Sequence, residues 1–552
     1  MTDRLGVVTD GAFNATLTVR LDPGVSTEKL RIGDFVIIEG SDHVFFSTIA
    51  DIQLRTTDAG IASQPPAGTS SFIARALAGT ATYATVQVKP MLMIDKPQGA
   101  FVDITVHPQP VRTIPMHFAI LRQAGELDFR DVFGEDHGHL FAMGYPLTMD
   151  IPVCLDLRRL MERSNGVFGQ SGTGKSFLVR LLLCGIIDRQ VGVNLVFDMH
   201  DEYAFGKQSE EGVWVRGLKE LFGSRVLVYS LDERAARRQG HRADVILKIG
   251  LNQIEPEDIL LLAEALNLRG TAEATIGLLQ DHYGDRWFPA LLDMSSEELN
   301  AFCEESGAHP ASLASLQRQL KLIGRRPYIV PEAQFAYIDD MVAALDHKRH
   351  VILHFGANRT TLDHILVANI VTRRVRHLYQ QKVERYEETR NAADRPQPLM
   401  ITLEEAHLFL NPSVARQTIF GTIARELRKY YVTLMVVDQR PSGIDPEVLS
   451  QLGTRITGKM TEERDIEAVL TGVANRSVLR SALESLDTRQ QILMMGHAVP
   501  MPIVLRTRRY DDAFYRSLRS VAEPGPEPVD ELERMALARA RVQQDISDLF
   551  GD

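Results

Sequence analysis

A glycine-rich stretch at residues 167–176 has the residue types and spacing of a phosphate-binding loop. It reads V-F-G-Q-S-G-T-G-K-S and satisfies the pattern G-x-x-x-x-G-K-[ST]. Glycines allow a tight turn whose backbone N–H groups cradle phosphate oxygens, and the N-terminus of the helix that follows favours the same anion. We expect Lys175 to contact the outer phosphates and the Ser176 hydroxyl to hold Mg²⁺. The predicted ATP-binding residues are Gly169, Gln170, Ser171, Gly172, Thr173, Gly174, Lys175 and Ser176.

A pair of carboxylates follows a second apolar run, L-M-I-T-L at 399–403. Adjacent acids on a surface loop would mean little, but at the end of a buried strand downstream of a P-loop they predict ATP hydrolysis. We expect Glu404 to polarise a water molecule of the Mg²⁺ coordination shell, and Glu405 to orient and deprotonate the attacking water. A third apolar run at 432–437 leads to Gln439, whose amide would sense the γ-phosphate or the attacking water.

Polar residues also end the apolar run V-N-L-V-F-D at 193–198. The segment D-M-H-D-E-Y places Asp198, His200 and Glu202 at the carboxyl edge of a predicted sheet, where α/β folds bind ligands. Two interpretations remain open. The residues form a polar surround for the nucleotide, or they contribute to a metal site whose other ligands are not apparent in the sequence.

Composition and length limit the kinds of protein that these groups belong to. The 552 residues predict more than one domain, and 44% hydrophobic with 24% charged residues is typical of a soluble globular protein. A net charge of −11 requires any DNA contact to use a local basic surface. The three scattered cysteines indicate core thiols in a reducing compartment. No signal peptide or membrane span is apparent, so we expect a cytoplasmic protein.

The alternation of apolar runs and turns predicts an α/β protein with a RecA-like P-loop NTPase core. Short β-rich runs between turn signals predict a small N-terminal β-barrel, and helical spacing between 253 and 329 predicts a helical insertion. The predicted domains are a barrel at 1–110, a connector at 111–145, an ATPase core at 146–252 and 330–510, the insertion at 253–329, and a C-terminal linker and helix at 511–552.

The C-terminal stretch combines a proline-rich linker with an apolar helical stripe. E-P-G-P-E-P at 523–528 predicts an extended linker, and the apolar residues from Leu532 to Leu549 recur at helical spacing. An isolated helix of this length is marginal in water, so the stripe must pack against something. Its own ATPase domain is one possible partner, but we favour a neighbouring subunit, because the proline-rich linker extends the tail away from its own core.

Five segments together resemble the HerA branch of the HerA–FtsK superfamily. These are G-Q-S-G-T-G-K-S, D-M-H-D-E-Y, L-E-E-A-H, A-R-E-L-R-K-Y and D-Q-R-P-S, in that order. The resemblance implies a homo-hexameric, Mg²⁺-dependent ATPase that translocates double-stranded DNA through a central channel. It also implies a separate effector, such as a nuclease or a sirtuin-like NADase, in DNA end processing or anti-phage defence.

The resemblance also assigns arginines. Arg428 matches the arginine of the family's R-K-Y stretch, implicated in nucleotide sensing, and Arg163 matches an arginine shortly before the P-loop that is a candidate finger acting in trans. Arg455 is a further candidate in trans. Three positions depart from the family pattern. Glu404 stands where many motors have aspartate, Ser164 replaces a histidine that is common after the first arginine, and Leu427 replaces a frequent glycine.

A second class of function stays open at this point. The chain could be an ATPase assembly platform that clusters and regulates an effector without processive translocation. The net charge of −11 favours the platform, whereas the complete set of hydrolytic residues favours the motor.

Overall fold

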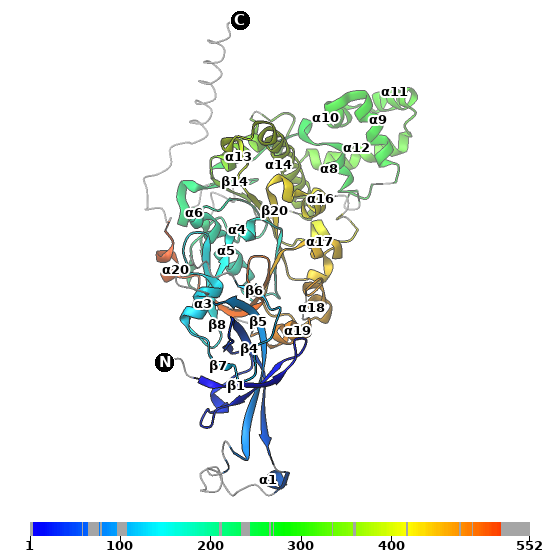
Figure 1. The fold of residues 1–552 in the computed structure, drawn as a ribbon. Coiled ribbons are helices and arrows are strands. Elements are labelled where there is room, and N and C mark those ends of the chain that lie inside the picture. The colour runs from blue at the N-terminus through cyan, green and yellow to red at the C-terminus, as the bar shows by residue number, and fades with distance from the viewer. Residues whose placement is uncertain are drawn as a thin grey trace. The chain divides into compact units, whose positions relative to one another are not determined.

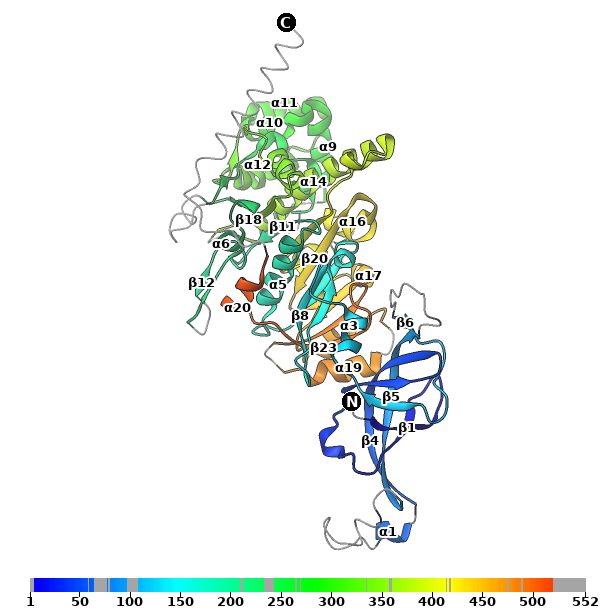
Figure 2. The same ribbon diagram turned by 60° about the vertical axis from the view of Figure 1, so that its left-hand side comes forward.

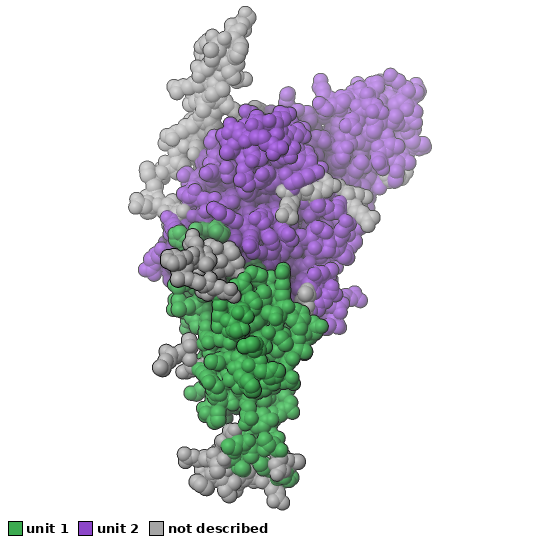
Figure 3. All heavy atoms as spheres, viewed as in Figure 1, with its two compact units in different colours: residues 1–155, 499–506 green, residues 156–498, 507–552 purple. Residues whose placement is uncertain are grey.

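The computed structural model falls into two compact units (Figure 3), which are described separately below. The first comprises residues 1–155 and 499–506, and the second comprises residues 156–498 and 507–552. The structure describes residues 4–57, 59–63, 77, 80–96, 108–208, 212–232, 243–263, 266–268, 270–333, 335–356, 360–413, 415, 418–473, 476–487 and 490–519. The predicted C-terminal helix lies outside these residues.

The first unit contains a closed antiparallel barrel (Figures 1 and 2). Its neighbour order is β2-β1-β7-β3-β4-β5, and β5 pairs back onto β2. Inward-facing side chains such as Val19, Ile38 and Val86 are fully buried because alternate residues of each strand face the interior. The predicted small barrel is therefore confirmed. Its strands are β1 (Arg4–Gly11), β2 (Leu17–Leu21), β3 (Phe35–Glu39), β4 (His43–Thr56), β5 (Thr82–Asp95) and β7 (Ile120–Gln123).

A short helix, α3 (Glu126–Phe133), packs on the barrel through Phe129, which meets Phe35 and Phe46 edge-on at 5.2 and 5.3 Å between ring centres. Arg122 of β7 ties this helix down by a bidentate ion pair with Asp128 at 2.7 and 2.8 Å. The remaining elements of this unit are η1 (Thr27–Lys29), α1 (Ala59–Ser63), β6 (Gln109–Pro110), β8 (Leu140–Pro146), β9 (Val153–Asp156) and β23 (Ile503–Thr507).

A mostly parallel sheet forms the centre of the second unit. The order of its strands is β15-β14-β18-β11-β19-β20-β10-β21-β22, and only the β21–β22 pair is antiparallel. The apolar runs of the sequence form its central strands and are buried on both faces, as expected for parallel strands under helices. The predicted α/β class is confirmed. The strands are β10 (Asn165–Phe168), β11 (Val193–Asp198), β14 (Val226–Ser230), β15 (Val245–Ile246), β18 (His350–His354), β19 (Leu399–Leu403), β20 (Val432–Asp438), β21 (Thr454–Thr457) and β22 (Gln491–Gly496).

Helices cover both faces of this sheet (Figure 2). The P-loop helix α5 (Lys175–Arg189) is buried along almost its whole length, and Cys184 lies within it. No helix in the described ranges is both long and apolar enough to cross a membrane. The other elements of the core are α4 (Leu157–Met161), β12 (Lys207–Gln208), β13 (Trp214–Val215), α6 (Leu218–Phe222), η2 (Gly223–Arg225), α13 (Tyr337–Asp346), α14 (Thr361–Thr389), η5 (Ala392–Asp394), α15 (His407–Leu410), α16 (Ile419–Glu426), η6 (Leu427–Tyr430), η7 (Pro441–Gly443), α17 (Pro446–Gln451), α18 (Glu463–Val469), α19 (Arg476–Ser485) and α20 (Asp512–Ser517).

Between β15 and β18 the chain forms a cluster of helices around the buried Trp287. The indole N–H donates to the Ile254 carbonyl at 3.2 Å, and Ser295 caps its helix by accepting from the Glu298 N–H at 3.3 Å. The elements here are β16 (Ile249–Gly250), η3 (Leu251–Gln253), α8 (Pro256–Leu260), α9 (Ala272–Tyr283), η4 (Gly284–Arg286), α10 (Trp287–Asp293), α11 (Ser296–Ser306), α12 (Pro310–Gly324) and β17 (Ile329–Val330).

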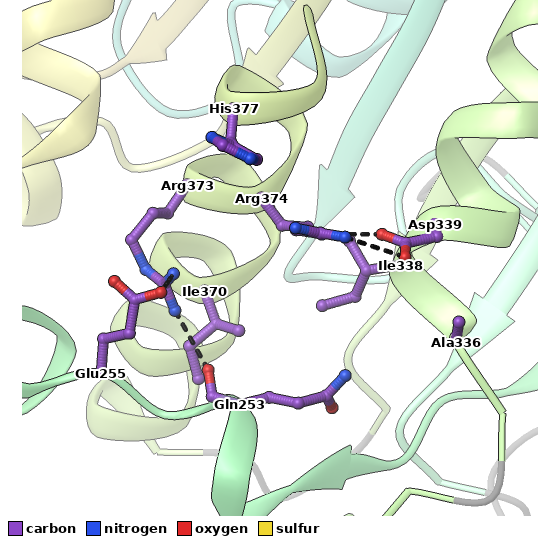
Figure 4. A pocket seen from close by; sticks show the side chains of 9 residues that line it. All are labelled: Gln253, Glu255, Ala336, Ile338, Asp339, Ile370, Arg373, Arg374 and His377. Carbon is purple, nitrogen blue, oxygen red and sulfur yellow. Dashed lines mark hydrogen bonds and ion pairs between the residues drawn. The ribbon is translucent and has the colours of Figure 1, made fainter. Parts of the chain in front are cut away.

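Two adjacent arginines of α14 line a pocket of about 350 Å³ at the base of this cluster (Figure 4). Arg373 donates to the Gln253 carbonyl at 3.0 Å and to the carboxylate of Asp258 at 2.8 Å, and the Asp258 side chain is fully buried. Arg374 instead makes a bidentate pair with Asp339, and both of these side chains are partly exposed. Only the first pair therefore compensates a charge that water cannot reach.

We predict that Arg373→Ala loosens the helical cluster much more than Arg374→Ala. Removing Arg373 leaves Asp258 charged and buried, which costs about 3–5 kcal/mol, whereas an exposed pair contributes about 0–1 kcal/mol. Hydrogen exchange of the backbone amides in α8 measures the local opening free energy. Equal protection of α8 in the two variants would contradict this account.

Candidate active site

Four loops that carry the predicted residues lie at one edge of the parallel sheet. They follow β10, β11, β19 and β20, which are consecutive or near neighbours in the order β11-β19-β20-β10. Because these strands run parallel, their carboxyl ends meet at the same edge. The P-loop, the D-M-H-D-E-Y segment, the two glutamates and Gln439 are thereby brought together, although Gly169 and Gln439 lie 270 residues apart in the chain.

The P-loop has the backbone that its glycines predict. Gly172 and Gly174 have φ angles of 78° and 84°, a region that favours glycine. At Gly169 a Cβ atom would lie 2.7 Å from the Thr173 hydroxyl, which itself donates to the Gln170 carbonyl at 2.7 Å. Lys175 Nζ donates to the same carbonyl at 3.1 Å. Ser176 follows in the first turn of α5 and is half-buried.

Lys175 lies close to three acidic side chains. Burial lowers the pKa of Lys175, while the negative charges of Glu405, Asp438 and Glu404 act in the opposite direction. The ammonium group of Lys175 is a hydrogen-bond donor only, so it supplies positive charge beside carboxylates that can ligate a metal ion. Ser171, by contrast, is exposed on the outer part of the loop.

The first glutamate is buried and held by a tyrosine. Tyr203 Oη donates to Glu404 Oε1 at 2.7 Å, whereas Glu404 Oε2 is buried and has no hydrogen-bond partner among the described residues. Burial above all, together with the nearby charge of Asp198, raises the pKa of Glu404 to about 8. A divalent cation beside the carboxyl would favour its ionised form.

Asp198 shapes the loop that presents Tyr203. Its carboxylate is buried and accepts backbone N–H groups of Glu202, Tyr203 and Ala204 at 2.7–3.0 Å. Burial raises the pKa of Asp198, and these three hydrogen bonds oppose that rise. This residue therefore fixes a turn, and His200 is the member of the segment that faces the second glutamate, with Nε2 4.0 Å from Glu405 Oε1.

The second glutamate is more accessible and belongs to a polar cluster. Gln439 Nε2 donates to Glu405 Oε1 at 3.3 Å, and His407 Nδ1 lies 3.6 Å from Glu405 Oε2. The same His407 nitrogen lies 2.9 Å from Asp438, and this hydrogen bond raises the pKa of His407. Glu405 has a φ of 45°, so its backbone is held in the left-handed region directly after the strand.

The residues present fit a divalent cation. Glu405, His407 and Asp438 each offer a ligand atom, and these atoms lie within 4.8 Å of one another. The unpartnered, buried Oε2 of Glu404 is a further oxygen of the type that Mg²⁺ prefers. The predicted metal ligands Ser176 and Glu404 remain predictions, because the structure gives no ligand geometry for them.

The arginines lie in three different settings. Arg163 precedes β10, so the length of that strand, about 13 Å at 3.3 Å per residue, separates it from its own P-loop. Arg455 is buried and donates to the carbonyls of Thr471 and Leu449 at 2.6 and 2.7 Å within its own subunit, so it is committed to internal contacts. The side chain of Arg428 lies outside the described residues.

Three residues of the cluster were not predicted to act there. Tyr203 ends the D-M-H-D-E-Y segment, and His407 and Asp438 stand next to other predicted residues, but none of the three was assigned a role in the site. Asp438 directly precedes Gln439 at a strand end, which is a signal that sequence reasoning could have used. No such signal marks the partner of Tyr203, because Glu404 lies 201 residues further along the chain.

Comparison with known proteins supports both units. Residues 5–107 match the HAS barrel domain, and residues 141–375 match the family described as the central domain of helicase HerA. The chain is 23% identical over 420 residues to the DNA double-strand break repair helicase HerA of Pyrococcus furiosus, covering 70% of this chain and 72% of that protein. It is 34% identical over 142 residues to HerA of Sulfurisphaera tokodaii, covering 25% and 28%.

Among solved structures, the bacterial conjugative coupling protein TrwBdeltaN70 in its trigonal form is similar with a TM-score of 0.46 and 13% identity. That match covers 73% of this chain and 95% of the other.

We predict that Tyr203→Phe lowers kcat about tenfold and leaves nucleotide affinity within about twofold. The change removes the hydrogen bond that positions Glu404, and a lost hydrogen bond to a carboxylate costs about 1.5–3 kcal/mol. Tyr379→Phe is the matched control, because the Tyr379 hydroxyl is also buried but makes no hydrogen bond among the described residues. An unchanged kcat in Tyr203→Phe would show that Glu404 needs no such support.

Proposed function

Because the chain belongs to the HerA family of helicases, we propose that it is an ATP-driven motor that translocates double-stranded DNA. The observation that carries the proposal is the convergence of the P-loop, both glutamates and Gln439 at one edge of the sheet. An ATPase platform would need the same hydrolytic residues, so the choice of a motor over a platform rests on the similarity to helicases named HerA. The P-loop, from Gly169 to Ser176, would bind the phosphates of ATP.

In this proposal Glu405 is the general base. It is the more accessible of the two glutamates, and its carboxylate is oriented by the Gln439 amide on one side and His407 on the other. A base must lie within hydrogen-bond reach of the water that it deprotonates, and the amide of Gln439 is suited to hold that water in line. Lys175 would contribute positive charge where negative charge gathers on the γ-phosphate.

A bound Mg²⁺ would neutralise charge on the β- and γ-phosphates. Ser176 and Glu404 are the residues that we assign to it, and Asp438 is a further candidate ligand. Tyr203 acts through Glu404 and is therefore a positioning residue.

We also propose a homo-hexameric ring in which an arginine from one subunit completes the site of the next. Arg163 is separated from its own P-loop by the length of β10, which favours action in trans. Arg428 remains a second candidate, whereas Arg455 is committed to carbonyls of its own chain. DNA would pass through the channel, and a separate effector, such as a nuclease or a sirtuin-like NADase, would act in DNA end processing or antiviral defence.

The roles proposed for Lys175 and Glu405 predict that their substitution impairs different steps, ATP binding and ATP hydrolysis. Lys175→Ala should abolish ATP binding, because it removes a phosphate contact, whereas Glu405→Gln should keep binding and lower turnover by at least about a hundredfold, because it removes the base. Binding of a fluorescent ATP analogue and steady-state hydrolysis measure the two effects. Hydrolysis by Glu405→Gln near the normal rate would refute the assignment.

The same hydrolysis assay separates the motor from the platform. A motor that holds duplex DNA should be stimulated by it, and the stimulation should fall steeply as salt rises because phosphate contacts are lost. Hydrolysis that is indifferent to a duplex at low salt would favour the platform.

Mixing inactive subunits tests the proposed trans arginine. Neither Lys175→Ala nor Arg163→Ala should hydrolyse ATP alone, but mixed rings would contain some interfaces with an intact P-loop and an intact arginine. We therefore expect the mixture to recover part of the wild-type rate. Arg455→Ala mixed in the same way is the control and should not be rescued, since its loss acts within its own subunit. Full activity at a monomeric mass would exclude the ring.

A further inference from the structure

A second polar pocket lies at the opposite edge of the same sheet, where the strands begin. Its volume is about 390 Å³, and its lining includes Gly192 just before β11, Arg225 just before β14 and His350 at the start of β18. Strands of five or six residues, about 17–20 Å, separate this edge from the candidate active site. Three cations and two histidines line the pocket, and the described residues that line it include no aspartate or glutamate.

Arg225 contributes a buried donor to this pocket. Its Nη1 is buried and has no hydrogen-bond partner among the described residues. An unsatisfied charged donor costs more than a neutral one, and such a group in a folded protein indicates a bound water or ion. Because a guanidinium always carries its charge, a pocket without acids leaves that charge uncompensated unless an anion enters.

His350 contributes a neutral donor. Its Nδ1 accepts the backbone N–H of Asn194 at 3.2 Å, so in the neutral ring the proton is on Nε2. Burial and, to a smaller extent, the charge of Arg225 together lower the pKa of His350 to about 3, so the ring is neutral near pH 7. Lys348 is exposed at the pocket and makes no ion pair with any residue in the described ranges.

The C-termini of nearby helices do not by themselves explain all the basic side chains of this pocket. α5 and α13 both end at this edge, and the free carbonyls of a helix C-terminus attract cations. That attraction explains Lys348, which follows the end of α13, and Arg349 donates from Nε to the Ser224 carbonyl at 2.9 Å. It does not explain Arg225, because a guanidinium that served a helix end would donate Nη1 to one of its carbonyls.

We propose that this pocket binds a phosphate group, held by Arg225 and Lys348 and by the Nε2–H of His350. A phosphate offers several acceptor oxygens in different directions, and arginine is well matched to it. The group could belong to the DNA backbone or to a free phosphate compound. None of these residues belongs to the candidate active site, so the proposal stands or falls separately from ATP hydrolysis.

The test is equilibrium dialysis of the full chain against radiolabelled inorganic phosphate. The nucleotide sites are first filled with a non-hydrolysable ATP analogue and Mg²⁺. We expect about one phosphate per chain, bound at least about tenfold more weakly by Arg225→Gln and several-fold more weakly by Lys348→Gln. Arg318→Gln removes an exposed arginine of α12 outside the pocket and should bind phosphate like the unmodified chain.

A second measurement distinguishes the two sources of the phosphate. If DNA supplies it, Arg225→Gln and Lys348→Gln should each weaken binding of a labelled duplex and reduce its salt dependence by about one phosphate contact. If a free compound supplies it, duplex binding stays unchanged while inorganic phosphate binding is lost. Absence of bound phosphate, or equal binding by Arg225→Gln and Arg318→Gln, would overturn the proposal.

Discussion

The hydrogen bond from Tyr203 to Glu404 joins two of the four strand ends on which the candidate active site is built. It connects the loop after β11 to the end of β19, and Asp198 fixes the shape of that loop by accepting three backbone N–H groups. Arg180 of the P-loop helix donates to the Glu202 carbonyl in the same loop, at 2.6 Å from Nε. The P-loop helix, the turn and the buried carboxyl are thus parts of one connected network, and moving any of them alone would leave a buried polar group without a partner.

Much of the fold could be predicted because its signals are local. The predicted strand runs at 193–198 and 399–403 form β11 and β19. Short, continuous apolar runs that are each followed by polar residues are typical of the buried strands of a parallel sheet. The barrel could also be predicted from the sequence, because its short strands alternate in burial and are separated by turn residues.

The interior of the candidate site was harder to predict. Both glutamates follow the same strand and look equivalent in sequence, yet Glu404 is 6% exposed and Glu405 is accessible. Their difference arises from the left-handed backbone at Glu405 and from the hydrogen bond that Glu404 accepts from Tyr203, in the loop after β11. Sequence patterns identify which strands end in polar residues, but they do not give the pairing between side chains that are far apart in the chain. Similarly, Arg455 became a structural residue only when its three carbonyl partners were known.

Arg180 has one more set of contacts, which links the nucleotide loop to the end of the described chain. Its guanidinium lies 5.6 Å from the ring centre of Tyr510, and Tyr510 also approaches Cys184 of the same helix at 3.8 Å. Further along, the Arg519 backbone N–H donates to Asp188 at 2.7 Å. The chain from 510 to 519 is therefore fastened along the P-loop helix. A force applied at residue 519 would therefore act on the P-loop helix before it reached any strand of the sheet. The segment from 510 to 519 is thus mechanically coupled to the phosphate-binding loop.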